Sequence, residues 1–397
     1  MVITNPDVVN ALRQLDRPMR VIVTGGGTGG HTYPALTAVR TLQAGLRAVG
    51  APPAEVLWVG QADSLEARVA AGDGIEFAAV ATGKIRRSAN PLRMLSARNI
   101  RDMFRVPLGV VQAWSVVGRF RPDVVLATGG YVAVPVGLAA WMRRRRLVVH
   151  EQTVRLGLTN RALARVVTRM AVSSESTLPL LPGSARETAV VTGNPVRPEV
   201  LAGHAEKGAA ALGVDRRYPT IYVTGGAQGS QQINTLVLDV LPWLLEYANV
   251  VHQCGPANED GLRQATANLP PALAGRYRLA GYVGPELPDV LALADVVISR
   301  SGAGTIAELT ALGKASVLIP LASSAGGEQA HNAQHLERAG AAVALVGEVT
   351  PRQLADAIGP LLGDPSRRAD MAHRARAQGR PDAAAHLVAV VLQTALT

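Results

Sequence analysis

Two glycine-rich segments, one in each half of the chain, have nearly the same sequence. Gly25–His31 reads GGGTGGH and Gly225–Ser230 reads GGAQGS, and each follows a short apolar stretch. A strand that ends in glycines and continues into a helix leaves unpaired backbone N–H groups and the positive end of the helix dipole at its tip. Such a tip binds phosphate or pyrophosphate. Two of them predict two nucleotide-type domains, with a cleft between them where two phosphorylated molecules could meet.

A third glycine turn, Arg300–Glu308, has an acid close behind it. It reads RSGAGTIAE, so Thr305 lies in the first turn of the expected helix and Glu308 lies near its start. A carboxylate at this place can accept hydrogen bonds from two ribose hydroxyls while the N–H groups of the turn face a phosphate. The alternative is an acid that only stabilises the helix dipole, which is worth about 0.3 to 1 kcal/mol.

The first loop also matches the GxGxxG fingerprint of dinucleotide-binding enzymes. That fingerprint requires an acid about 20 residues further on to bind a ribose, and residues 43–53 contain none. Nicotinamide-dependent chemistry is therefore not predicted. His31 follows the loop directly, which places an imidazole beside the expected anion site. The alternative is a helix-start histidine without a chemical role.

Two further segments of the first half follow strands on the same side of the expected sheet. A glycine pair precedes Tyr131, and the tripeptide His150–Gln152 follows the next strand. Ligands of open α/β sheets bind at the carboxyl ends of the strands, so both segments are candidate ligand contacts. The alternatives are an ordinary tight turn at the glycines and a buried histidine–carboxylate pair with a structural role.

No metal site is predicted. His331 and His335 have the spacing of two zinc ligands, but no third ligand is evident and no Asp-x-Asp pair ends a strand. We interpret them as surface or core histidines. The single cysteine, Cys254, excludes an internal disulfide framework and a cysteine-based metal cluster.

Much of the formal net charge of +10 lies in one stretch. Lys84–Arg121 contains nine basic residues and one acid, interleaved with apolar side chains such as Trp114. An apolar helix face rimmed by arginines binds an anionic membrane surface, with about 1 kcal/mol from each basic residue. Trp141 with Arg143–Arg146 forms a second cluster of this kind. The alternatives are a solvated arginine-rich helix and a nucleic-acid surface, but no nucleic-acid module occurs and aromatic residues make up only 4% of the chain, so nucleic acid is not predicted.

Apolar runs bounded by turn residues alternate with helical stretches, which predicts a parallel α/β architecture. The 397 residues are enough for two domains. The expected strands are Val21–Thr24, Val56–Val59, Phe77–Val80, Val124–Ala127, Leu147–His150, Met170–Val172, Ala189–Val191, Thr220–Thr224, Asn249–Gln253, Tyr277–Ala280, Val296–Ser299, Ser316–Ile319 and Ala342–Val346.

We predict an N-terminal domain over residues 1–193, a proline- and glycine-containing hinge over 194–215 and a C-terminal domain over 216–397. The last stretch, Asp382–Leu396, reads as a helix that could pack on either domain. The longest apolar run, Val132–Met142, is shorter than the roughly 20 residues of a membrane span. The N-terminus lacks the pattern of a secretory signal, so a cytoplasmic location is expected.

Taken together, these motifs resemble the MurG family of peptidoglycan glycosyltransferases over almost the whole chain after Arg20. The resemblance implies the GT-B fold, in which two Rossmann-like domains with parallel sheets face each other across a cleft. It also implies inverting transfer of N-acetylglucosamine from UDP-N-acetylglucosamine to lipid I, a lipid-pyrophosphate-linked acceptor, giving lipid II at the cytoplasmic face of the plasma membrane. The matching segments, in family order, are Gly26–His31, Gly129–Tyr131 with Pro135, His150–Gln152 with Gly157–Asn160, Thr192–Arg197, Gly225–Gly229, Ser301–Ala303 with Glu308, and Gln329 with Asn332.

The resemblance further implies roles for individual residues. Imidazole titrates near neutral pH, so His31 is the expected base for the acceptor hydroxyl, with Glu151 as a rival. Loop N–H groups and Arg197 would stabilise the departing diphosphate without a metal or other cofactor. The residues implied to bind the donor are Thr28, Gly29, Gly30, Thr153, Arg197, Ala227, Gly284, Ala303, Gly304, Thr305, Glu308 and Gln329. Those implied to bind the acceptor are His31, Gly129, Gly130, Tyr131, His150, Glu151, Gln152 and Asn160.

Three residues depart from the usual pattern of that family near the sugar and the phosphates. Ala227 replaces a serine, Thr153 replaces an asparagine, and Glu328 stands where some members have glutamine. These departures leave the exact donor and acceptor open. The alternatives are a related tailoring glycosyltransferase that acts on a secondary metabolite, a UDP-N-acetylglucosamine 2-epimerase, and a non-catalytic membrane-bound UDP-sugar sensor.

Overall fold

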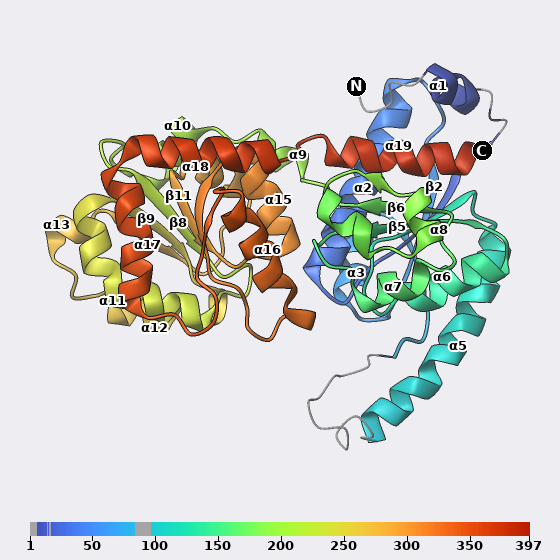
Figure 1. Cartoon of the computed structure of the whole chain (residues 1–397), viewed down its shortest axis with the longest axis horizontal. Helices are drawn as coiled ribbons and strands as arrows, with labels where there is room; N and C mark the ends of the chain where they lie inside the picture. The colour runs from blue at the N-terminus through green and yellow to red at the C-terminus, as the bar shows by residue number, and fades with distance from the viewer. Residues whose placement is uncertain (1–5, 14, 16, 84–96) are drawn as a thin grey trace. The chain divides into compact units, whose positions relative to one another are not determined.

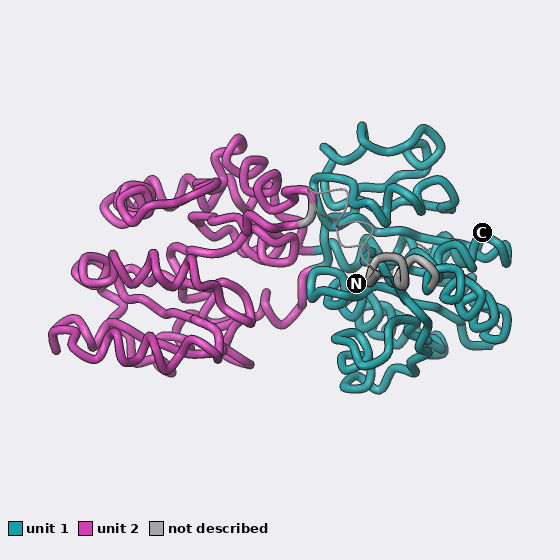
Figure 2. The backbone as a smooth tube through the Cα atoms, turned by 90° about the horizontal axis from the view of Figure 1, so that it is seen from below, with its two compact units in different colours: residues 1–195, 382–397 teal, residues 196–381 magenta. Residues whose placement is uncertain are grey.

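The chain divides into two compact units, Met1–Pro195 with Asp382–Thr397, and Val196–Pro381 (Figure 2). The division differs from the predicted domain limits in two ways. Most of the expected hinge folds as two short helices of the second unit, and the C-terminal segment returns to the first. The computed structural model describes residues 6–13, 15, 17–83 and 97–397 (Figure 1).

Within the described residues, the first unit contains a seven-stranded parallel sheet in the order β3-β2-β1-β4-β5-β6-β7. On β1, Val21 and Val23 point into one core together with Trp58, whereas Ile22 points into the other. The central strands are apolar on both faces because helices cover both faces. The strands are β1 (Arg20–Thr24), β2 (Glu55–Gly60), β3 (Glu76–Ala79), β4 (Val124–Ala127), β5 (Arg146–Glu151), β6 (Arg169–Val172) and β7 (Val190–Val191).

The last helix of the chain belongs to the first unit, which settles a point that the sequence left open. It packs on α2, where Leu387 and Leu46 share one core, and Arg146 donates to the carbonyl oxygen of Thr394 at 2.8 Å. Helices α5 and α6 cover the opposite face of the sheet. The helices of this unit are α1 (Pro6–Arg13), α2 (Gly29–Ala48), α3 (Leu65–Gly72), α5 (Ala97–Phe120), α6 (Ala133–Met142), α7 (Leu158–Leu163), η1 (Glu175–Leu180), α8 (Gly183–Glu187) and α19 (Ala383–Leu396).

The second unit, as far as the chain is described, contains a six-stranded parallel sheet in the order β10-β9-β8-β11-β12-β13. Its first strand repeats the pattern of β1, because Ile221 and Val223 point into one core and Tyr222 into the other. The strands are β8 (Thr220–Thr224), β9 (Asn249–Gln253), β10 (Tyr277–Ala280), β11 (Val296–Ser299), β12 (Ala315–Leu318) and β13 (Val343–Ala344).

Helices cover both faces of the second sheet as well. They are α9 (Pro198–Leu201), α10 (Ala205–Leu212), α11 (Gln231–Tyr247), η2 (Pro256–Asn258), α12 (Glu259–Ala265), α13 (Pro271–Ala274), α14 (Leu287–Leu293), α15 (Ala303–Leu312), η3 (Ala325–Gly327), α16 (Glu328–Arg338), α17 (Pro351–Gly363) and α18 (Pro365–Gln378). Every strand predicted from the sequence is present, although β13 is shorter than expected.

In each sheet the strand order reverses beside the first strand, because β1 lies between β2 and β4 and β8 lies between β9 and β11. Ligands of open α/β sheets bind at the carboxyl ends of the strands at such a reversal. In the first unit the turns at this point are Gly25–Gly30, here called the first glycine loop, and Thr128–Tyr131. In the second unit they are Gly225–Ser230, the second glycine loop, and Arg300–Gly302.

Candidate active site

Two glycine turns touch each other at the carboxyl edge of the first sheet. The backbone N of Gly26 donates to the carbonyl oxygen of Gly129 at 3.4 Å. A Cβ on Gly130, whose φ is +79°, would lie 2.2 Å from the carbonyl oxygen of Gly26, and a Cβ on Gly129 would lie 3.0 Å from Nδ1 of His31. Glycine at these two positions therefore allows both the contact between the turns and the close approach of the imidazole.

The acid Glu66 lies directly behind the first glycine loop. Its side chain is fully buried, and its two oxygens accept from the backbone N of Gly27 at 3.2 Å and from that of Gln61 at 3.4 Å. A Cβ on Gly26 would lie 2.3 Å from the carboxyl carbon. One of the loop amides that the sequence offered to an anion is thus bound by a side chain from α3.

His31, on the first turn of α2, is oriented through its Nδ1 atom. That atom lies 3.0 Å from the carbonyl oxygen of Thr128 and 3.1 Å from Oε1 of Gln152. Both partners can only accept, so Nδ1 carries the hydrogen, and in the neutral imidazole the lone pair is on Nε2. The imidazole is half-buried. This is the tautomer that a base requires.

His150 and Gln152, two further predicted acceptor contacts, form hydrogen bonds next to His31. His150 is fully buried and Gln152 is 4% exposed. His150 donates through Nε2 to the carbonyl oxygen of Gly193 at 2.9 Å, so its Nδ1 accepts from the Gln152 amide at 3.3 Å. Burial, partly opposed by the bond to Gly193, lowers the pKa of His150 to about 4. The neutral His150 therefore orients Gln152, which in turn orients His31.

Both carboxylate oxygens of Glu151 are occupied by donors from its own loop. Oε1 accepts from the backbone N and the hydroxyl of Thr153 at 3.1 and 2.9 Å. Oε2 accepts from the backbone N of Gly157 and from Nδ2 of Asn160, each at 2.9 Å. Glu151, Thr153 and Asn160 are buried. They form a network that fixes the loop between β5 and α7, and their contacts with acceptor and donor stay predictions.

Tyr131 covers the first glycine loop. Its hydroxyl donates to Oε1 of Gln61 at 2.9 Å, and the hydroxyl of Thr82 donates to the same atom at 2.9 Å. A Cβ on Gly27, whose φ is +80°, would lie 2.7 Å from Cε1 of the tyrosine ring. Gly27 therefore contacts Tyr131 through its Cα side and Glu66 through its backbone N, although the residue itself is exposed. Tyr131 itself is half-exposed and stays a predicted acceptor contact.

The second glycine loop lies over a half-buried arginine. Ser230 begins α11 and accepts from the backbone N of Ile233 at 3.3 Å. Arg300 donates to the same hydroxyl at 2.6 Å, to Oε1 of Gln232 at 2.9 Å, and to two backbone carbonyls just after β12 at 3.0 Å. These acceptors are all uncharged, and no described acid forms an ion pair with Arg300. Burial lowers its pKa, but a guanidinium stays charged near neutral pH.

Arg197 and Glu308 meet in the second unit although they lie far apart in sequence. Arg197 donates through Nη2 and Nε to Oε1 of Glu308 at 2.8 and 3.1 Å. Burial raises the pKa of Glu308, and the charge of Arg197 opposes that effect. Helix α15 begins at Ala303, so Glu308 lies beyond the first turn, which disfavours the alternative that it stabilises the helix dipole. No described residue donates to Oε2 of Glu308.

The turn after β11 is fixed to α16. Ser301 donates to the carbonyl oxygen of Gln329 at 2.8 Å, and Asn332 donates to the carbonyl oxygen of Ser301 at 3.1 Å. Oε1 of Gln329 accepts from the backbone N of Leu321 at 3.0 Å. The other predicted donor contacts of this unit are partly or fully exposed at the same edge of the sheet: Ala227, Gly284, Ala303, Gly304 and Thr305.

Three residues that sequence reasoning missed support these turns. Two of them are Glu66, which no motif singles out, and Arg300, which precedes a glycine turn without a predicted role of its own. The third, Gln253, ends β9 as a buried amide. A polar residue at the last position of a predicted strand is the signal that could have drawn attention to it. In the described part of the chain, His, Cys, Asp and Glu side chains form no group of three that could hold a metal ion.

The predicted membrane-binding stretch, Lys84–Arg121, lies partly outside the described residues. Its described part is α5, which packs against α6. The Arg143 guanidinium lies 3.3 Å from the centre of the Trp114 ring. None of the helices described here is long and apolar enough to cross a bilayer. The large apolar side chains exposed on α5 and α6 are Leu108, Val111, Trp114, Trp141 and Met142.

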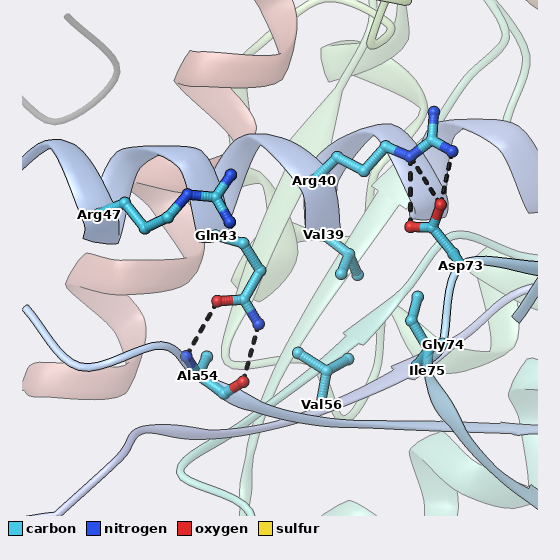
Figure 3. Close-up of a pocket in the computed structure, with 9 residues that line it drawn as sticks. All are labelled: Val39, Arg40, Gln43, Arg47, Ala54, Val56, Asp73, Gly74 and Ile75. Atoms are coloured by element: carbon cyan, nitrogen blue, oxygen red, sulfur yellow. Dashed lines mark hydrogen bonds and ion pairs between the residues drawn. The ribbon is translucent and has the colours of Figure 1, made fainter.

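A pocket on the first unit lies away from this edge, between α2 and the amino end of β2 (Figure 3). Two of its polar side chains are already paired across it. Arg40 forms an ion pair with Asp73, and Gln43 both donates to and accepts from the backbone of Ala54. We do not assign this pocket to the site.

Two family models match the chain. The N-terminal domain of glycosyltransferase family 28 matches residues 21–172, and the C-terminal domain of the same family matches residues 220–387. Together they span most of both units.

Curated relatives match over most of their length. An enzyme of Salinibacter ruber is 37% identical over 384 residues, covering 96% of this chain and 98% of the relative. One of Bacillus cereus is 36% identical over 337 residues, covering 84% and 89%. The Salinibacter ruber protein is named UDP-N-acetylglucosamine–N-acetylmuramyl-(pentapeptide) pyrophosphoryl-undecaprenol N-acetylglucosamine transferase, and the Bacillus cereus protein carries the same name with the number 2.

Three solved structures have similar folds at different levels of sequence identity to this chain. MurG of Acinetobacter baumannii superposes with a TM-score of 0.73 at 26% identity, covering 95% of this chain and 100% of that structure. The glycosyltransferase of kitacinnamycin has a TM-score of 0.65 at 20% identity, covering 94% and 99%. A UDP-GlcNAc 2-epimerase from Neisseria meningitidis has a TM-score of 0.64 at 14% identity, covering 94% and 100%. The last two share the fold alone.

Proposed function

The chain belongs to glycosyltransferase family 28 and has the GT-B fold, and on that premise we propose that it transfers N-acetylglucosamine from UDP-N-acetylglucosamine to lipid I, the undecaprenyl-pyrophosphoryl-linked muramyl-pentapeptide, giving lipid II. The observation that carries the proposal is the 37% identity to a relative so named over nearly the whole of both chains. The tailoring glycosyltransferase and the epimerase are supported by likeness of fold only.

The second unit supplies the groups for the UDP-sugar. Glu308 keeps Oε2 for a ribose hydroxyl, while Arg197 holds the other oxygen in place. The N–H groups of the second glycine loop and of the turn after β11 suit a diphosphate, because both precede a helix. The Arg300 guanidinium beneath the loop adds a positive charge that no described acid neutralises. These groups stabilise the charge that develops on UDP as the sugar leaves.

The first unit supplies the base. In an inverting displacement the acceptor hydroxyl attacks the anomeric carbon, the bond to UDP breaks, and a base removes the hydroxyl proton. His31 suits this role because Nδ1–H is fixed by two acceptors and the lone pair on Nε2 is left for the proton. Glu151 is the weaker candidate, because its two oxygens already accept four hydrogen bonds.

The proposal is tested by incubating the purified protein with radiolabelled UDP-N-acetylglucosamine and a lipid I analogue. We expect label in a product that partitions with the lipid, and release of UDP in equal amount. A parallel incubation with the donor alone tests for the epimerase, which would isomerise the sugar without an acceptor. Binding of the donor without transfer to the lipid I analogue would contradict the proposal.

We further propose that the protein binds the cytoplasmic face of the plasma membrane through α5 and α6. The exposed fractions of Leu108, Val111 and Trp141 are 52%, 65% and 55%, on two helices that pack against each other. Arginines of the basic stretch provide attraction to anionic lipids. One weak apolar contact and one electrostatic contact together give stable binding where either alone does not.

Sedimentation with lipid vesicles tests the membrane proposal. We expect wild-type protein to sediment with vesicles that contain anionic lipid and to be released by high salt. Val111→Glu lowers the bound fraction, whereas Tyr247→Glu, at a 53% exposed position in the second unit, leaves it unchanged. Equal binding of the two variants would contradict the assignment of the surface to α5 and α6.

A further inference from the structure

Gln253 connects two segments of the proposed donor site, the second glycine loop and the segment that contains the predicted donor contact Gly284. It is the last residue of β9 and is 4% exposed. Its Nε2 donates to the hydroxyl of Thr224 at 2.9 Å and to the carbonyl oxygen of Gly226 at 3.0 Å. Its Oε1 accepts from the backbone N of Val283 at 2.8 Å. One side-chain amide thus joins the second glycine loop to the segment that contains Gly284.

The Gln253 amide adds a direct polar link to the packing of the two segments. Gly226 has a φ of +91° and is exposed, and apart from Gln253 its polar backbone atoms bind the Thr224 hydroxyl at 3.0 Å and the backbone N of Gly229 at 2.9 Å. Val283 is buried in the core with Tyr222, but the residues on both sides of it are exposed or partly exposed. Of the hydrogen bonds described for these residues, those of the Gln253 side chain connect Gly226 with Val283.

The strand end that carries Gln253 is itself held firmly. The carbonyl oxygen of Cys254 accepts from Nδ2 of Asn234 and from Nδ2 of Asn258, each at 2.9 Å. A Cβ on Gly229 would lie 1.8 Å from that same oxygen, so the second glycine loop packs directly on it. Asn234 in turn contacts the buried His252 through Oδ1 at 3.1 Å. Gln253 therefore extends from a fixed support.

We propose that Gln253 is a positioning residue that sets the distance between the phosphate-binding loop and the Val283–Gly284 segment, so that the diphosphate and the remainder of the donor bind as one ligand. This inference rests on the donor site proposed above. Two subsites held at the spacing of a ligand bind it more tightly than two subsites that move independently, because the second contact forms at a high effective concentration. Gln253 itself need not touch the ligand.

The test compares the affinities of uridine and UDP by calorimetry in wild type, Gln253→Met and Gln253→Glu. Methionine removes all three hydrogen bonds of the side chain, whereas glutamate keeps an acceptor for Val283 but cannot donate to Gly226. We expect the ratio of the uridine Kd to the UDP Kd to fall by about tenfold in both variants. Hydrogen exchange at the Val283 amide should speed up in the methionine variant and stay slow in the glutamate variant.

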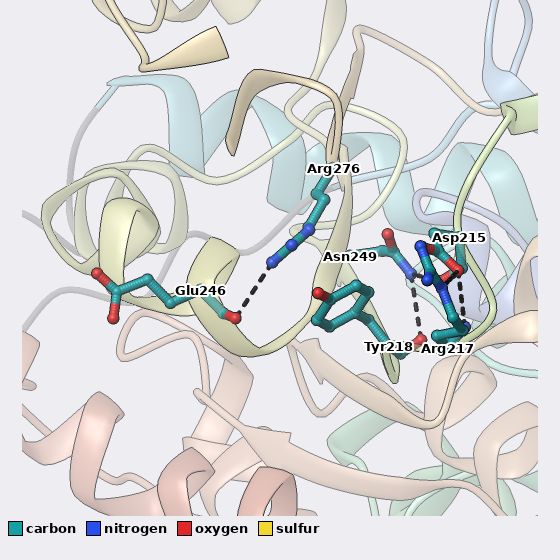
Figure 4. Close-up of polar contacts among 6 residues, drawn as sticks. All are labelled: Asp215, Arg217, Tyr218, Glu246, Asn249 and Arg276. Atoms are coloured by element: carbon teal, nitrogen blue, oxygen red, sulfur yellow. Dashed lines mark hydrogen bonds and ion pairs between the residues drawn. The ribbon is translucent and has the colours of Figure 1, made fainter. Parts of the chain in front are cut away.

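Asn249 offers a matched control at the opposite end of the same strand. It is fully buried, and its Nδ2 donates to the carbonyl oxygens of Asp215 at 2.8 Å and Tyr218 at 3.2 Å (Figure 4). Asn249→Leu removes comparable bonds from β9 without touching the glycine loop. We expect it to lower the stability of the second unit and to leave the ratio of the two dissociation constants unchanged.

Three outcomes would overturn the inference. The first is an unchanged ratio in both Gln253 variants while UDP still binds, which leaves the donor site intact and refutes only the positioning role. The second is an equal fall of the ratio in Asn249→Leu, which would show a general loss of stability. The third is a wild-type protein that binds neither uridine nor UDP, which refutes the proposed donor site and the inference with it.

Discussion

The two glycine loops have similar sequences, but a carboxylate contacts the first loop and a guanidinium contacts the second. Behind the first loop, Glu66 is fully buried and accepts from the amide of Gly27. Beneath the second loop, Arg300 donates to the hydroxyl of Ser230 and has no described acid as a partner. The glycines determine the path of the backbone in both loops. A side chain from another element determines which ligand charge each loop can accept.

This difference assigns separate tasks to the two loops. A diphosphate is favoured at the second loop, where the positive end of the α11 dipole and the Arg300 guanidinium act together. At the first loop the backbone N of Gly27 donates to the Glu66 carboxylate, whose charge disfavours an anion, and the imidazole of His31 lies on the first turn of the helix that follows. We therefore expect substitutions in the first unit to change turnover and those in the second unit to change donor affinity.

The largest effect is expected from His31→Ala. Loss of a general base lowers turnover by about 10² to 10⁴. The variant loses the hydrogen bonds to Thr128 and Gln152, which costs about 1 kcal/mol of stability. Turnover is measured with the lipid I analogue, and stability by urea unfolding. Turnover close to wild type would remove His31 from the chemistry and weaken the contrast between the loops.

Acid should destabilise both units, because each contains a buried neutral histidine. Burial lowers the pKa of His252 in the second unit to about 4, from 6.5 in the unfolded chain, and lowers the pKa of His150 in the first unit to a similar value. Below pH 6.5 the unfolded chain binds protons that the folded chain does not. The contribution of each histidine to the free energy of unfolding is therefore complete above pH 6.5 and is lost progressively towards pH 4. The loss is about 3 kcal/mol for each histidine.

Hydrogen exchange measured separately in the two units checks this prediction. His252→Gln should flatten the pH dependence of the second unit alone, and His150→Gln that of the first unit alone. A wild-type protein whose stability does not change between pH 7 and pH 4.5 would contradict the assignment of both groups.

The third prediction concerns the stability effect of Glu66, the buried acid next to the first glycine loop. Gly26→Ala should lower the stability of the first unit by about 2 kcal/mol, because the new Cβ would lie 2.3 Å from the carboxyl carbon of Glu66. Gly304→Ala is the control in the second unit. No atom lies within 4 Å of its Cβ, so this change should raise stability by about 0.5 to 1 kcal/mol.

A double-mutant cycle sharpens this test. In a Glu66→Ala background the space behind Gly26 is empty, so adding Gly26→Ala should cost less than half of its original effect. Equal costs in the two backgrounds would show that the acid does not fill the space behind the loop.

Sequence periodicity and turn residues predicted the fold well. Each expected strand is present, and the glycine turns lie where the strand order reverses. These features depend on local patterns, namely apolar alternation and glycine at positive φ, as at Gly130. The side on which the last helix packs was not predictable, because its apolar residues do not identify the surface that covers them.

The arrangement of the site was predicted only in part. The position of His150 and Glu151 at the carboxyl end of β5 was predicted, but their burial was not. The roles of Glu66 and Gln253 depend on contacts with segments that lie 27 to 39 residues away, such as Gly27 and Val283. A single sequence does not contain that information, because burial and pairing of a polar side chain are set by the tertiary fold.

Glu308→Ala tests the other side of the comparison with the smallest expected effect. Loss of the acceptor for a ribose hydroxyl, and of the partner that orients Arg197, should raise the KM for UDP-N-acetylglucosamine by about tenfold. The value of kcat should change little, because the ribose contact is the same in the ground state and the transition state. Glu308→Gln keeps an acceptor oxygen, so its KM should rise less. A lower kcat at unchanged KM would place Glu308 in the chemical step, and the division of donor binding and catalysis between the two units would then fail.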